Sequence, residues 1–288
     1  MTSDKSNLSD LRREIDDIDN ALHDLLMRRA AVVDRVKESK QTDGGVIYRP
    51  GREAEIMRRL AARHTGSLSR NVVVRIWREL MAAFVSMQGH FVVAVWDNGD
   101  VGCWDVARDH FGTETTMTRH QSTGAVLHAI AEGAATIGVL PLPQDGEADP
   151  WWPAFALGRD KRLKICARVP FASRGNSRGI RSGALIVSAA APEASGNDRS
   201  FLLVECDEST SRGRLTDGLV AAKFDIVTVV GLSSSDAHSA ILVFLVEIAG
   251  FATPDDDRLA AFVEHSTGIV SADIVGAYAV PLDGALGS

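Results

Sequence analysis

The 288-residue sequence has few cysteines, few aromatic residues and no long apolar run. Its three cysteines are far apart, so they form neither a disulfide framework nor the paired spacing of a zinc site. A membrane-spanning helix needs about 18 consecutive apolar residues, and no such stretch is present. The opening residues MTSDKSNLSD lack the apolar core of a signal peptide. These absences predict a protein of the reducing cytoplasm.

An excess of positive charge is also missing. The formal net charge is -7 at pH 7, so global charge gives no support for binding nucleic acid. Hydrophobic residues make up 45% of the chain, which is enough to build buried cores, and the length favours two or three domains. We therefore expect a multidomain protein that has neither a nucleic-acid nor a membrane partner.

A long helical pattern without proline or glycine covers residues 8–40. Its apolar residues recur at steps of three and four, as in a helix that packs along a partner helix: Leu8, Leu11, Ile15, Ile18, Leu22, Leu25, Val32 and Val36. Arg29 occupies the next position of this stripe after Leu25, where a leucine is expected. Because an unpaired buried charge is costly, an anionic group should meet this guanidinium.

The other basic residues of this predicted helix include Arg12, Arg28 and Lys40. Lys40 follows Arg29 by about three turns, roughly 16 Å of rise, so both side chains can reach one small dianion. Arg12 precedes Arg29 by roughly 25 Å and can share a compact pocket with it only from a second chain. Taken alone, Arg12 and Arg28 also fit solvated surface residues.

Two shorter helices are predicted next. Pro50 suits the first turn of a helix that runs to about His64. Ser69 can cap a third helix. The apolar stripe of that helix consists of Val73, Ile76, Trp77, Leu80, Met81, Phe84 and Val85. Gln88 continues the stripe, so its amide is either a satisfied core group or a ligand contact.

The segment LRREIDDIDNALHDLLMRRAAVVDRVKESK resembles the first helix of the all-helical chorismate mutases, and Arg52, Glu53 and Gln88 fit the same family. The resemblance implies that residues 1–90 form a three-helix chorismate mutase domain in an intertwined homodimer. It implies the pericyclic rearrangement of chorismate to prephenate in aromatic amino-acid biosynthesis. This reaction needs no metal and no cofactor.

The resemblance also implies a role for each matched side chain. Arg12 would enter the partner's pocket and bind a substrate carboxylate, and Arg29 would bind a carboxylate in its own subunit. Lys40 would contact a carboxylate and the breaking ether oxygen. Glu53 would accept a hydrogen bond from the substrate hydroxyl, and Gln88 would donate one to the ether oxygen.

Arg52 would be a nearby supporting charge.

Two positions depart from the family pattern. Arg49 stands where the family often has an acidic residue, and Phe84 stands where it often has a small hydroxyl residue. The resemblance implies that Phe84 narrows the pocket or removes one carboxylate hydrogen bond.

From about residue 91 the pattern alternates between strands and helices, which is typical of an α/β lobe. The segment EGAATIGVLPLPQDGE resembles the first lobe of prephenate dehydratases. Such enzymes carry a Thr-Arg-Phe segment, and its nearest match here is 197–201, where the threonine is absent. We expect residues 91–196 to be a reduced, non-dehydrating relative. The alternative is a packing or interaction domain.

The loop 173–183 is rich in Gly, Ser and Arg. It is interpreted either as a mobile loop or as an anion-binding loop that uses Arg174, Arg178 and Arg181. Residues 197–288 then follow the order β-α-β-β-α-β, which predicts a ferredoxin-like fold. This part resembles an ACT domain, although the segments that shape a phenylalanine site in that family match only partly.

These observations predict a cytoplasmic, homodimeric chorismate mutase with a dehydratase-like region and an ACT-like domain. One alternative is a bifunctional chorismate mutase and prephenate dehydratase, against which the absent threonine argues. Another is a regulatory or scaffolding relative without catalysis. The complete set of matched charged and amide side chains argues against the second alternative.

Overall fold

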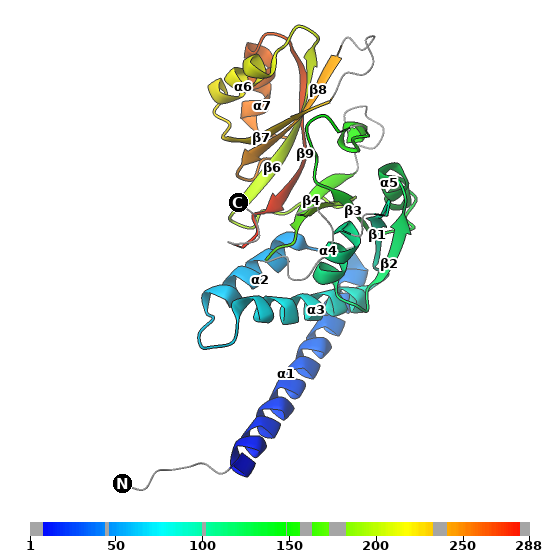
Figure 1. The fold of residues 1–288 in the computed structure, drawn as a ribbon, viewed down its shortest axis with the longest axis vertical. Coiled ribbons are helices and arrows are strands. Elements are labelled where there is room, and N and C mark those ends of the chain that lie inside the picture. The colour runs from blue at the N-terminus through cyan, green and yellow to red at the C-terminus, as the bar shows by residue number, and fades with distance from the viewer. Residues whose placement is uncertain are drawn as a thin grey trace, which may run out of the picture. The chain divides into compact units, whose positions relative to one another are not determined.

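The computed structural model describes residues 8–43, 46–99, 102–147, 149–155, 163–172, 183–232 and 241–282. The chain begins with three helices, α1 (Leu8–Asp43), α2 (Pro50–Ala62) and α3 (Arg70–Gln88), which confirms the predicted helical N-terminal region. Figure 1 shows α1 as one unbroken helix. No helix within the described ranges is both long enough and apolar enough to cross a membrane.

An α/β region follows the helices. Its elements are β1 (Val92–Trp96), α4 (Gly102–Phe111), β2 (Thr116–His120), α5 (Thr123–Ala131), β3 (Ile137–Pro141), the short 3-10 helix η1 (Trp152–Phe155), β4 (Lys164–Val169) and β5 (Ala184–Ser188). β1, β3 and β5 are buried along their whole length, whereas β2 is mostly exposed. The predicted alternation of strands and helices included a strand at this place, but the TMTRH sequence of β2 carries no apolar pattern that would give its bounds.

The remaining elements are β6 (Asp198–Asp207), α6 (Arg212–Ala221), β7 (Ile226–Gly231), β8 (Ile241–Ala249), α7 (Asp257–His265) and β9 (Ile269–Ala279). They follow the expected β-α-β-β-α-β order. Their strands pair antiparallel in the spatial order β9-β6-β8-β7. The two helices cover one face of these strands (Figure 1).

The described strands form one sheet of nine, in the order β2-β1-β3-β5-β4-β9-β6-β8-β7. Its two halves meet where β4 runs parallel to β9, with Ile165 opposite Gly276. A Cβ atom at position 276 would collide with the Ile165 backbone, so glycine permits this close approach. The sheet is therefore continuous across residue 196, the predicted boundary between the second and third regions.

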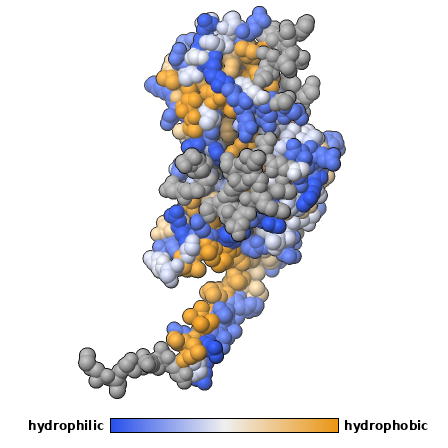
Figure 2. Space-filling view, in the orientation of Figure 1, coloured by the Kyte–Doolittle hydropathy of each residue, from blue (hydrophilic) through white to orange (hydrophobic). Residues whose placement is uncertain are grey.

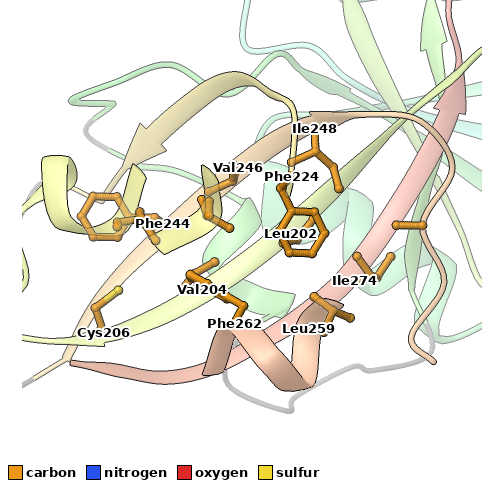
Figure 3. Packing of buried hydrophobic residues seen from close by; sticks show 13 residues of the cluster. Leu202, Val204, Cys206, Phe224, Phe244, Val246, Ile248, Leu259, Phe262 and Ile274 are labelled. Atoms are coloured by element: carbon orange, nitrogen blue, oxygen red, sulfur yellow. The ribbon is translucent and has the colours of Figure 1, made fainter. Parts of the chain in front are cut away.

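The core of the C-terminal half lies between the strands and the α6–α7 pair. Figure 3 shows Leu202, Val204 and Val246 from the sheet together with Phe224 and Phe262. The two phenylalanine rings meet edge to face, 6.4 Å between centroids. The aligned apolar faces of β6, β8 and β9 and of the two helices explain why this segment could be recognised from its sequence pattern.

The chain divides into two compact units whose boundary passes through the helical region. One unit is Met1–Ile47 with Phe84–Gly89, and the other is Tyr48–Ala83 with His90–Ser288. Within the second unit, Arg58 of α2 donates to the backbone oxygens of Ser195, Asn197 and Val280 at 2.7–2.9 Å. The helix α2 is thus tied to segments far along the chain. The domain boundaries 1–90, 91–196 and 197–288 remain a prediction.

Leu219 provides a test of the C-terminal core. Its side chain is 0% exposed in the cluster between α6, α7 and the sheet. Leu219→Ala should lower the free energy of unfolding by about 2–5 kcal/mol, because it removes buried methyl groups and leaves a cavity. Urea denaturation measures this loss. The neighbouring Val220 is 60% exposed, so Val220→Ala should change little. Equal losses in both variants would contradict the packing described here.

Candidate functional site

The apolar stripe predicted for α1 is present, and it faces solvent in the single chain. Leu8, Leu11, Ile15, Ile18, Leu22, Leu25, Val32 and Val36 are each 41–61% exposed. In Figure 2 apolar side chains gather along one side of α1 while polar side chains occupy the other. A helix with such a long exposed stripe has a surface suited to packing against a partner helix.

Arg29 lies on this helix, half-buried, with its guanidinium 4.2 Å from the centre of the Phe84 ring. This distance allows a cation–π interaction, in which the electron-rich face of the ring attracts the charge. Burial lowers the pKa of Arg29 from its ordinary value. The phenylalanine that departs from the family pattern therefore contacts the arginine of the apolar stripe directly.

Lys40 and Gln88 come together although they are distant in sequence. The Lys40 Nζ donates to Gln88 Oε1 at 2.9 Å and to the backbone oxygen of Val46 at 2.7 Å. The Gln88 Nε2 in turn donates to the backbone oxygen of Phe84 at 3.0 Å. The first compact unit thus places Arg29, Lys40 and Gln88 around the last turn of α3.

Arg12 and Arg52 are exposed. Arg12 lies on α1 seventeen residues before Arg29, roughly 25 Å along the helix axis, so its side chain cannot reach Arg29 within one chain. Arg52 forms a surface ion pair with Glu55 at 2.7 Å. Arg49 pairs with Glu193 at 2.8 Å. These pairs are solvated and contribute little to stability.

Glu53 belongs to the second compact unit and is largely buried there. Its Oε2 accepts a hydrogen bond from Arg78 Nη1 at 2.8 Å, and both side chains are little exposed, 13% and 7%. Burial raises the pKa of the Glu53 carboxyl, and the Arg78 charge opposes that shift. The arginine therefore compensates part of the cost of placing a carboxylate out of water.

His110 of α4 completes this buried group. Its Nε2 lies 3.3 Å from Arg78 Nη1, and the imidazole is 7% exposed. Burial and the adjacent arginine hold the pKa of His110 well below its ordinary value, because both disfavour a second positive charge. Three elements, α2, α3 and α4, thus each contribute one side chain to the Glu53 cluster.

Arg78 and His110 were missed from the sequence. The buried face of α3 includes Val74, Arg78, Met81 and Val85, which are spaced four, three and four residues apart. Arg78 therefore interrupts an apolar stripe, the signal that identified Arg29. The predicted stripe instead included Ile76, which is 52% exposed. No local pattern marked His110, because its partners lie on other helices.

The segment nearest to a dehydratase motif has other partners. Arg199 Nη1 donates to Glu247 Oε1 at 3.1 Å, and the hydroxyl of Tyr278 donates to the same oxygen. Arg168 donates to the Tyr278 oxygen at 3.2 Å. Burial and Glu247 raise the pKa of Tyr278 to about 12. Arg199 thus joins a network that links β4, β9, β6 and β8. The arginines of the proposed anion-binding loop lie outside the described residues.

The N-terminal helical region is similar to a known protein family. Residues 11–89 match the family model of chorismate mutase type II. These residues are a type II chorismate mutase domain. The match includes the segments that hold Arg12, Arg29, Lys40, Arg52, Glu53 and Gln88, but His110 lies beyond it.

A bifunctional chorismate mutase/prephenate dehydratase from Pseudomonas aeruginosa is 30% identical over 150 residues. The alignment covers 50% of this chain and 41% of the relative, so the chain matches about two fifths of that protein's length. Because 150 residues exceed the chorismate mutase match, the similarity extends into the α/β region.

Two solved structures are similar at lower levels. The chain of "GqqA, a novel type of quorum quenching acylases" has a TM-score of 0.47 and 18% identity, covering 68% of this chain and 97% of that one. Prephenate dehydratase from Streptococcus mutans has a TM-score of 0.46 and 13% identity, covering 67% and 99%. Both TM-scores are below 0.5, too low to establish a shared fold.

The buried histidine predicts a pH-dependent stability. Below the ordinary histidine pKa of 6.5 the unfolded chain binds a proton at position 110, whereas the folded protein does not. The free energy of unfolding should therefore fall as the pH is lowered from 7.5 to 5.5, by at most about 1.4 kcal/mol per pH unit from this residue. His110→Gln should flatten the dependence, measured by urea denaturation across the pH range.

His128 offers the matched control, because it is an exposed histidine on α5. His128→Gln should retain the wild-type slope. A slope unchanged in His110→Gln would show that His110 is protonated equally in the folded and unfolded states.

Proposed function

We propose that this chain is a chorismate mutase, which converts chorismate to prephenate in aromatic amino-acid biosynthesis. The contact between Lys40 and Gln88 carries the proposal, since it joins the end of α1 to the end of α3 at 2.9 Å. In this contact Lys40 is the donor and the Gln88 carbonyl oxygen is the acceptor, so the two side chains lie side by side, where each can turn an N–H group toward one substrate oxygen. The type II chorismate mutase match of residues 11–89 supports the same reaction.

The reaction is an isomerisation in which a C–O ether bond breaks as a C–C bond forms in the same molecule. The protein therefore supplies no nucleophile and no proton. Arg29 and Lys40 bind the carboxylates and hold the compact conformer, which converts binding into correct orientation. Lys40 and Gln88 stabilise the negative charge that develops on the ether oxygen.

Glu53 is assigned to the substrate hydroxyl, from which it accepts a hydrogen bond. Its contact with Arg78 uses Oε2, and within the described residues no hydrogen bond to Oε1 is found. That oxygen is therefore the one assigned to the substrate. Arg52 is assigned a supporting electrostatic role, and neither a metal nor a cofactor takes part.

A homodimer is part of the proposal. The exposed stripe of α1 would pack against the same helix of a second chain, which would bury its leucine and isoleucine side chains. With the two helices antiparallel, Arg12 of each chain would reach the pocket of the other. An isologous pair would then contain two equivalent sites.

Residues 91–196 are proposed as a reduced dehydratase-like region and 197–288 as an ACT-like domain. The three cysteines are free and buried, which suits a reducing cytoplasm. The name of the P. aeruginosa relative favours a second candidate, a bifunctional chorismate mutase and prephenate dehydratase. Incubation with prephenate distinguishes the two, because only the bifunctional enzyme forms phenylpyruvate.

A mutase assay on the purified chain tests the main proposal, with Arg29→Ala as the decisive variant. Loss of this electrostatic contact should lower kcat/KM by about a hundredfold or more while the fold is retained. Arg28→Ala is the matched control, since Arg28 is an exposed neighbour on the same helix. Near-normal turnover in Arg29→Ala would contradict the assigned pocket. An inactive but folded wild-type dimer would favour a scaffolding protein.

Subunit mixing tests the shared site. Arg12→Ala and Arg29→Ala should each be inactive, whereas a mixed dimer contains one intact pocket and one that lacks both arginines. Random exchange makes about half of the dimers mixed, so activity should recover to roughly a quarter of the wild-type level. Because the two substitutions change the mass equally, one variant is isotope-labelled, and native mass spectrometry then resolves the mixed dimers from both homodimers. No recovery after confirmed exchange would contradict the antiparallel arrangement.

A further inference from the structure

The buried Glu53 cluster contains more than the acid itself. Arg78 Nη1 lies 2.8 Å from Glu53 Oε2 and 3.3 Å from His110 Nε2, so one guanidinium nitrogen serves both neighbours. The three side chains come from α2, α3 and α4. Because Nη1 carries two hydrogens, it can donate one to the carboxylate and one to the imidazole.

Donation by Arg78 to His110 requires one particular tautomer of the imidazole. An arginine has no acceptor, so the 3.3 Å contact is a hydrogen bond only if the imidazole Nε2 is unprotonated. The ring then carries its proton on Nδ1 and is neutral. Phe111 contacts the ring edge to face with centroids 4.7 Å apart. The imidazole is thus held as a fixed acceptor for Arg78.

Few other contacts orient the guanidinium of Arg78. Its Nε is buried and has no hydrogen-bond partner in the described part of the chain. The Phe171 ring lies 5.2 Å from the guanidinium carbon and allows rotation in its plane. The directional contacts of this arginine are therefore Glu53 on one side and His110 on the other.

We propose that His110 is a positioning residue for the chorismate mutase reaction, acting on Glu53 through Arg78. The proposal rests on the proposed function, in which Glu53 accepts a hydrogen bond from the substrate. It adds a residue from α4, which lies outside the matched segment 11–89. The α/β region would thereby supply part of the support for the mutase carboxylate.

The physical reason is the number of donors that face one carboxylate. While Nη1 also donates to His110, its bond to Glu53 is confined to Oε2, and Oε1 stays available to the substrate. Without an acceptor at position 110 the guanidinium can turn and engage both carboxylate oxygens, a geometry that arginine favours. Glu53 would then remain buried and paired but would no longer present Oε1.

Three substitutions separate positioning from packing. His110→Leu removes the hydrogen-bond acceptor and fills the buried position with an apolar side chain. His110→Gln places an amide oxygen near the position of Nε2, whereas His110→Asn is too short to do so. His128→Leu on α5 is the control at an exposed histidine. Steady-state mutase kinetics and thermal unfolding are measured for all variants in the full-length protein.

We expect His110→Leu and His110→Asn to lower kcat/KM by about 10- to 100-fold, the range typical of groups that orient a catalytic side chain. Most of the loss should appear in kcat. His110→Gln should stay within about threefold of wild type, and His128→Leu should be unchanged. If His110→Leu does not fold, the comparison of His110→Gln with His110→Asn still distinguishes positioning from packing.

Two results would overturn the inference. One is a folded His110→Leu with wild-type kcat, and the other is a His110→Gln as impaired as His110→Asn, which would indicate a packing role alone. Both require an active wild-type enzyme. A wild-type chain without mutase activity would instead refute the proposed function, and the positioning role with it.

Discussion

A guanidinium on an apolar helix face has to meet an electron-rich partner, and the half-buried Arg29 and the buried Arg78 each do so. Arg29 lies over the Phe84 ring, and Arg78 donates to Glu53 and His110. Desolvation makes a charge without such a partner more costly than the apolar contacts around it can offset. The two arginines therefore constrain which groups can surround them on α1 and α3.

This constraint explains how the chemistry is divided along the chain. Arg29, Lys40 and Gln88 gather at the end of α3, where the proposed mutase site has its cations and its amide. Glu53 is placed in the other compact unit by contacts with α3 and α4. A carboxylate can be buried there because Arg78 is buried with it. The position of Glu53 therefore depends on residues outside the three N-terminal helices.

The α/β region contributes structure that its sequence only partly indicates. α2 is fastened by Arg58 to backbone oxygens at residues 195, 197 and 280, and β4 meets β9 at a glycine. Arg199, the residue nearest to a dehydratase motif, binds the buried Glu247. In this network the Arg199 side chain links neighbouring strands of the sheet.

Local patterns in the sequence were sufficient to predict the three helices, the stripe along α1 and the β-α-β-β-α-β order, because apolar periodicity follows directly from helix and strand geometry. The same reasoning identified Arg29 as a polar residue on an apolar face. It could not give the bounds of β2, whose exposed residues carry no apolar pattern, nor the pairing of β4 with β9. It also could not find the partners of Glu53, since Arg78 and His110 approach it from two other helices. Only the tertiary structure brings such side chains together, because a buried charge is compensated by groups close in space, wherever they lie in the chain.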